Sequence, residues 1–214
     1  ILVVEKNMSL ENDLFRRLRP NIQRLVEYGF IEQSGIYYYQ TKLEDSGMYA
    51  LITVDNSNVS GKVMDEFTDE EYVAVHTVGK KGNFAIKVRT AYLSCLEDIA
   101  KNCFEKMMYS SDQANVMHEW LINQFHDTAD HPFTKSQNSK RTVDNDFTAY
   151  KPSGCDKMYA LMFTIEKRKL DKACDETLID AVNIKVEPST VVDLLQLPGF
   201  YPAYHMNKKH WVTA

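Results

Sequence analysis

The spacing of apolar positions in the first half of the chain predicts a broken helical segment followed by strands. Residues 8–28 carry apolar residues at helical spacing, but Pro20 removes a backbone donor, which predicts a kink or two short helices, the second ending at Gly29. Two β-rich runs, residues 36–41 and 48–54, are joined by turn-forming residues and are expected to pair as a hairpin.

A second hairpin is expected from residues 59–64 and 71–77, which are linked by the acidic run 65–70. The clearest helix of the chain follows over residues 84–108, because one apolar stripe recurs there at helical spacing. The stripe consists of Val88, Tyr92, Leu96, Ile99 and Cys103. The first half therefore predicts helix, four short strands, helix.

In the second half, Ser110 and Gln113 have the spacing of a capping box, which predicts a helix from there through about residue 125. Its apolar face, expected to be buried, comprises Val116, Met117, Trp120, Leu121 and Phe125. Residues 126–146 are polar and weakly patterned and are expected to form a long loop with room for a short strand.

Strand patterns return around the turn signature Pro152-Ser153-Gly154, and one of these strands is apolar on both faces, as expected of a central strand. The predicted elements are strands at 147–151, 157–165 (the central one) and 181–186, a short helix from Pro188 through about Gln196, and a strand starting at 210–213. The Met-Tyr-Ala-Leu sequence at residues 48–51 recurs at 158–161, which suggests two divergent copies of one unit or a chance repeat.

These elements predict an α+β fold with two domains, residues 1–109 and 110–214. The chain has 214 residues, 44% of them hydrophobic, but no apolar run approaches the roughly 20 residues needed to cross a bilayer, so no membrane partner is expected. The four cysteines form no CxxC pair, which favours reduced thiols in a cytoplasmic protein. No signal peptide is visible, and since the chain opens on Ile1 and stops at Ala214, both natural ends are expected to be missing.

Residues 197–211 differ from ordinary core segments, because they crowd two prolines, a glycine, four aromatic residues, two histidines and two lysines. This mixture predicts a turn shaped by proline and glycine that leads into a sheet strand, with Tyr204 and Trp211 on the buried side. The net charge of −5 and the pI near 5.7 argue against a protein that coats nucleic acid, so any nucleic-acid site has to be a local patch.

Three blocks, residues 157–162, 182–188 and 198–211, together resemble the MmcQ/YjbR family of small bacterial proteins, over about residues 115–214. The resemblance is to the longer form of the family, which carries an N-terminal extension domain. It implies a frataxin-like (CyaY-like) second domain, in which an antiparallel sheet is flanked by helices. It also implies a closing helix after Trp211, so a truncated C-terminus is expected.

The family is often labelled DNA-binding because of its fold, which implies a non-enzymatic protein that binds DNA weakly through a local basic and aromatic patch. The residues of this chain that would form the patch are His205, Asn207, Lys208, Lys209, His210, Tyr201, Lys167, Arg168 and Lys169. The same residues also fit a solvated turn next to buried aromatics. A third interpretation is a His/Asn/Lys surface that binds a small anionic ligand or another protein, with no nucleic-acid role.

Metal and enzyme chemistry find little support in the sequence. His205 and His210 are five residues apart, unlike the pair in a helical HExxH motif, and no carboxylate or thiolate lies in the same stretch, so no metal or other cofactor is expected. Nucleophile elbows, phosphate-binding loops and dinucleotide turns are absent from the sequence. We therefore expect no catalytic residues and no enzymatic activity.

Overall fold

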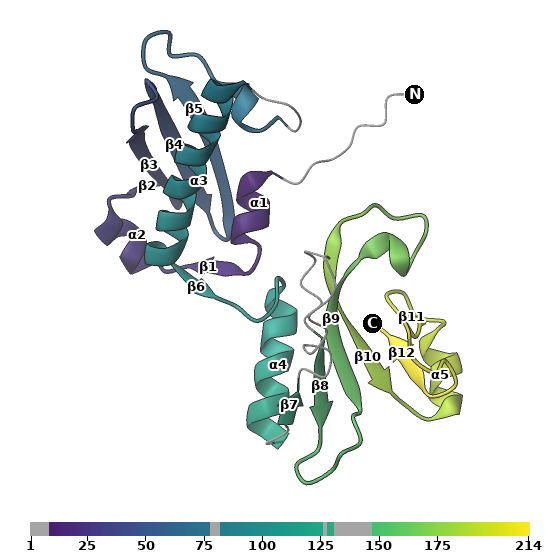
Figure 1. Cartoon of the computed structure of the whole chain (residues 1–214). Helices are drawn as coiled ribbons and strands as arrows, with labels where there is room; N and C mark the ends of the chain where they lie inside the picture. Colours follow the sequence, from purple (N-terminus) through teal and green to yellow (C-terminus); the bar gives the residue numbers. More distant parts are fainter. Residues whose placement is uncertain (1–8, 78–81, 126–127, 131–146) are drawn as a thin grey trace. The chain divides into compact units, whose positions relative to one another are not determined.

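The structure, a computed structural model, describes residues 9–77, 82–125, 128–130 and 147–214 and divides into two compact units, residues 1–108 and 109–214. Each unit combines helices with antiparallel sheet, which confirms the predicted α+β class (Figure 1). No helix in the described residues is long and apolar enough to cross a membrane.

The first unit is built around a four-stranded antiparallel sheet in the order β2-β3-β4-β5, with a separate two-stranded pair, β1-β6. Its elements are α1 (Leu10–Phe15), β1 (Leu18–Pro20), α2 (Ile22–Tyr28), β2 (Ile31–Gln33), β3 (Ile36–Leu43), β4 (Met48–Asp55), β5 (Asn58–Asp65), the 3₁₀ turn η1 (Val73–Val75), α3 (Asn83–Cys103) and β6 (Phe104–Lys106).

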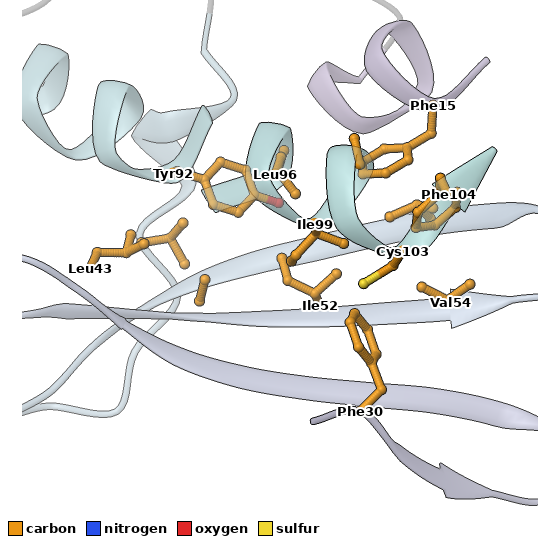
Figure 2. Close-up of a cluster of buried hydrophobic side chains, with 14 of the residues drawn as sticks. Phe15, Phe30, Leu43, Ile52, Val54, Tyr92, Leu96, Ile99, Cys103 and Phe104 are labelled. Atoms are coloured by element: carbon orange, nitrogen blue, oxygen red, sulfur yellow. The ribbon is translucent and has the colours of Figure 1, made fainter. Parts of the chain in front are cut away.

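The predicted apolar stripe of α3 forms the core of this unit. All five of its residues are fully buried, and they face the inward side of β4, where Ala50, Ile52 and Val54 are buried as well. Figure 2 shows Ile99 of α3 directed toward the strand that carries Ile52. The apolar residues that recur with helical spacing in α3 therefore pack against the apolar residues that alternate along β4, in one hydrophobic layer.

Two short helices replace the first long one, as Pro20 suggested, and the second ends at Gly29, whose φ of 117° lies in the left-handed region. The segment around Pro20 is not a kinked helix, however. It is the strand β1, which pairs with residues 104–106. Because those residues form a strand, α3 ends at Cys103 and not at residue 108 as predicted. A pairing between segments more than 80 residues apart leaves no local trace in the sequence.

The second predicted hairpin is wrong. Strand β5 pairs with β4 through a tight turn in which Asn56 takes a φ of 52°, a conformation that asparagine tolerates. Residues 71–77 contribute one isolated bridge, Met64 to Glu71, and the turn η1. The fourth strand is instead β2, which pairs with β3.

The second unit contains an antiparallel sheet in the order β11-β12-β10-β9-β8-β7, accompanied by helices. Its elements are α4 (Asp112–Phe125), β7 (Thr128–Asp130), β8 (Thr148–Lys151), β9 (Ala160–Glu166), the 3₁₀ turn η2 (Lys167–Lys169), β10 (Leu178–Lys185), α5 (Pro188–Leu194), β11 (Tyr201–Pro202) and β12 (Trp211–Thr213). The first six residues of β9 are buried, which confirms the predicted central strand. The loop expected at 126–146 lies outside the described residues except for β7.

The predicted buried face of α4 is wrong in part. Val116 is 66% and Trp120 is 52% exposed, whereas Asn115 is buried. The Asn115 side chain accepts from the backbone N–H of Tyr109 and donates to its carbonyl oxygen, both at 2.9 Å, and these bonds set the rotation of the helix. The side chain of Phe125 lies outside the described residues.

The strand order agrees with the duplication hypothesis. Strands β2-β3-β4-β5 and β7-β8-β9-β10 are both antiparallel meanders that follow a helix, and the repeated Met-Tyr-Ala-Leu sequence falls at the third strand of each. Duplication remains a hypothesis, because such meanders are common and the connection between β9 and β10 is longer than that between β4 and β5.

Two cysteines of the first unit should react slowly. Burial, reinforced by the nearby Asp98 carboxylate, raises the pKa of the Cys95 and Cys103 thiols to about 11. About one in a thousand of these thiols is ionised at pH 8, so we expect iodoacetamide to alkylate both at least about tenfold more slowly than the exposed Cys155. Mass spectrometry of labelled peptides measures this. Equal labelling in the folded chain would contradict it, and labelling in guanidinium is the control.

Candidate functional site

The segment 197–211 contains the edge strand β11 of the sheet of the second unit and the loop that leads to the neighbouring strand β12. Tyr201 and Pro202 pair with Thr213 and Val212, and residues 203–210 form the loop that connects β11 to β12. Trp211 is 6% exposed, which confirms its predicted burial, and Tyr204 is half-buried. The predicted turn leading into a strand is thus present.

A closed set of hydrogen bonds fixes this loop to the sheet. The Asn183 amide donates to the Tyr204 carbonyl oxygen at 2.9 Å, the Tyr204 N–H donates to the Thr213 hydroxyl at 2.9 Å, and that hydroxyl donates to Asn183 Oδ1 at 2.6 Å. Asn183 and Thr213 are almost fully buried, so these bonds are shielded from water. The start of the loop therefore has one defined position.

The aromatic residues of this segment are already engaged. Tyr204 stacks on Phe163 of β9 with ring centroids 5.8 Å apart, and its ring also lies 4.1 Å from that of His205. Tyr201 is half-buried within β11. Trp211 is buried and the Tyr204 ring is in contact with two other rings, so neither offers a free face on which a base could stack.

Asn207 shapes the turn that carries the two lysines. Its side-chain oxygen accepts from the Lys209 N–H at 3.0 Å, and its carbonyl oxygen accepts from the His210 N–H at 3.0 Å. The amide oxygen is thus used within the turn, while Lys208 and Lys209 are exposed. His205 is also exposed, at a φ of 55°.

The antiparallel sheet brings further lysines to the same end. Strand β8 ends where β9 begins, β10 ends beside the start of β9, and β12 starts beside the end of β10. The lysines at these strand ends are Lys151, Lys157, Lys185, Lys208 and Lys209, and we call them the basic rim. Neighbouring strands lie about 4.8 Å apart, so the rim extends over roughly 15 Å.

Four of the rim lysines are exposed and unpaired. Among the described residues, Lys157, Lys185, Lys208 and Lys209 form no ion pair. Asp156 directly precedes Lys157 in the sequence, and Glu187 lies two residues after Lys185. The rim therefore has an excess of positive charge, although the whole chain is acidic.

The other predicted basic residues lie elsewhere. Lys167, Arg168 and Lys169 form η2, at the opposite end of β9, about 20 Å from the rim along a seven-residue strand. Arg168 is paired with Glu166 and Glu176, and Lys169 lies 3.7 Å from Glu166. The structure thus does not bring the two groups of candidate residues together.

Sequence reasoning missed Lys151, Lys157 and Lys185 as partners of Lys208 and Lys209. Each adjoins a predicted strand end, but so does Lys167, and only the pairing of the strands shows which of these lysines lie together. Metal ligands are not assembled here, since no group of three His, Cys, Asp or Glu side chains in the described residues could hold an ion.

The fold and this site define a two-unit α+β protein with a lysine-rich sheet end. No protein-family model matches the chain, and no curated protein matches it. Among solved structures, the chain is similar to a crystal structure of a Pseudomonas syringae protein, with 32% identity, a TM-score of 0.40, and coverage of 48% of this chain and 79% of that one. A solution NMR structure from the same organism gives 32% identity, a TM-score of 0.37 and coverage of 48% and 74%.

A third solved structure is a Deinococcus radiodurans protein with a DUF419 domain. It is 26% identical, the match covers 45% of this chain and 58% of that one, and the TM-score is 0.30. DUF419 belongs to the MmcQ/YjbR-like family.

Proposed function

We propose that the second unit binds the phosphate backbone of DNA through the basic rim, weakly and without catalysis. The observation that carries this proposal is that exposed lysines converge from neighbouring strand ends and are not paired with carboxylates of the described residues. Lysine ammonium groups neutralise phosphates and release condensed counterions, which drives association.

The engaged aromatic rings support contact with the backbone and not with the bases. Stacking on bases needs a free ring face, and Tyr204 and Trp211 have none to offer. Phosphate contacts carry no sequence information by themselves. Binding through the rim is therefore expected to be independent of base sequence.

We also infer that the chain belongs to the MmcQ/YjbR family and acts in the bacterial cytoplasm. The three sequence blocks in family order support the family, and the unpaired cysteines suit a reducing compartment.

The test measures the binding of the full chain to a fluorescein-labelled 20-base-pair duplex by fluorescence anisotropy at a series of salt concentrations. We expect the Lys208→Ala/Lys209→Ala variant to bind about tenfold more weakly at low salt and to lower the slope of log K against log salt by about 2, because two phosphate contacts are lost. The matched control is Lys167→Ala/Lys169→Ala at the other end of β9.

Two results would overturn the proposal. If the control variant weakens binding as much as the rim variant, the rim is not the site. If the wild-type chain shows no salt-dependent binding at low salt, DNA is not the ligand, and a small anion or a protein surface becomes the better explanation of the same lysines.

A further inference from the structure

The histidines of the described residues fall into two groups. His76 Nδ1 lies 3.9 Å from a buried carboxylate of α1, and His118 Nδ1 lies 2.6 Å from a buried tyrosine hydroxyl of β8. His205 and His210 differ from them, because neither imidazole forms a hydrogen bond or an ion pair within the described part of the chain. Both of these histidines belong to the loop that carries two lysines of the basic rim.

His205 is exposed, and the backbone next to it is fixed. The preceding residue, Tyr204, donates its N–H to the Thr213 hydroxyl, and its carbonyl oxygen accepts from the Asn183 amide, both at 2.9 Å. The His205 ring lies 4.1 Å from the Tyr204 ring, measured between centroids. The imidazole is therefore presented to solvent from a defined position at the start of the loop.

His210 closes the same loop and is half-buried. Its carbonyl oxygen accepts from the Val186 N–H at 2.9 Å, and its N–H donates to the Asn207 carbonyl oxygen at 3.0 Å. These bonds place His210 beside the end of β10, where Lys185 pairs with the next residue of β12. The backbone thus holds this histidine among the rim lysines.

The charged groups around the two histidines are mostly positive. Among the described residues, Asp180 of β10 is engaged by the Ser111 N–H and the Thr164 hydroxyl, at the far end of that strand. The charged groups of the loop, the near end of β10 and α5 are Lys185, Lys208, Lys209, Glu187 and Asp193. Protonation of the histidines therefore adds to an existing excess of positive charge.

We infer that the basic rim is a pH-sensitive phosphate site, which binds DNA more tightly when His205 and His210 are protonated. The inference rests on the function proposed above and adds its regulation. Lysine keeps its charge from pH 8 to pH 6, whereas an exposed imidazole gains its charge over this range. A bound phosphate favours the charged imidazole, so DNA binding and protonation strengthen each other.

The test measures the affinity of the full chain for a 20-base-pair duplex by anisotropy at one low salt concentration, at pH 8 and at pH 6. A rhodamine label is used because its emission does not change over this range. The lower value stays above the pI of about 5.7, so the net charge of the chain keeps its sign. We expect about fivefold tighter binding at pH 6, since two partly protonated histidines add somewhat less than two lysine charges.

The variant His205→Asn/His210→Asn should change its affinity less than about twofold between the two pH values, because asparagine carries no charge. Asparagine also tolerates the φ of 55° at position 205. The matched control is His76→Asn in the first unit, which should keep the fivefold change. Circular dichroism at both pH values confirms that each variant is folded.

Three results would overturn the inference. Salt-dependent binding of equal strength at both pH values would do so and would leave the proposed function intact. A pH effect that persists in His205→Asn/His210→Asn, or that disappears in His76→Asn, would place its origin outside the rim. If no salt-dependent binding occurs at either pH, the proposed function itself fails, and its regulation with it.

Discussion

Gly61→Ala is expected to lower the free energy of unfolding of the first unit by about 1–3 kcal/mol, as overpacking of a filled core does. A Cβ atom at this position would lie 1.9 Å from the Tyr92 hydroxyl and 3.1 Å from Ile52 Cδ1. Tyr92 is fully buried and its hydroxyl donates to the buried Glu11 carboxylate, so the ring cannot turn away without breaking that bond. Hydrogen exchange of the α3 amides in the full chain measures the loss.

Tyr92→Phe tests whether the clash with the Tyr92 hydroxyl causes this loss of stability. It removes the atom that the new Cβ would meet, so adding Gly61→Ala to Tyr92→Phe should cost at least about 1 kcal/mol less than adding it to the wild type. Additivity within about 0.5 kcal/mol would show that the hydroxyl is not the obstacle. Both tryptophans, Trp120 and Trp211, belong to the second unit, so their fluorescence should keep its unfolding midpoint.

Phe163→Ala should destabilise the second unit by about 3–5 kcal/mol, the usual cost of emptying an aromatic core position. Phe163 is 1% exposed, and its ring centroid lies 5.4 Å from that of Phe147 and 5.8 Å from that of Tyr204. The substitution also removes the contact with Tyr204, which belongs to the loop that carries Lys208 and Lys209. Urea unfolding followed by tryptophan fluorescence measures the change.

Leu197→Ala is the matched control for Phe163→Ala. Leu197 is 51% exposed, so its truncation should change stability by less than about 0.5 kcal/mol. A loss below about 1 kcal/mol for Phe163→Ala would mean that the site collapses around the missing ring. In that case the loop would not depend on Phe163 for its position.

The sequence predicted those features of the fold that depend on residues close together in the chain. The stripe of α3, the helix end at Gly29, the central strand β9 and the start of α5 at Pro188 follow from side-chain period and backbone conformation, and the structure has them. The chain's α+β class follows from the order of these elements.

Pairings between remote segments could not be predicted in the same way. Strand β1 exists because residues 104–106 lie beside it, and the rotation of α4 is set by Asn115, a polar residue that an apolar count ignores. For the candidate site, the sequence pointed to Lys208 and Lys209. It could not show that Lys157 and Lys185 join them while Lys167 does not, because that depends on which strands end together.

The positions of the rim lysines are set by the hydrogen-bonded pairing of the strands, and their side chains take no part in packing the core. A substitution at Lys157, Lys185, Lys208 or Lys209 changes the charge pattern without disturbing packing, because all four side chains are exposed. Such a surface can be altered in evolution one charge at a time, with the fold unaffected. Related proteins could therefore share this sheet and still differ in ligand, so the charge at each strand end is what should be compared among them.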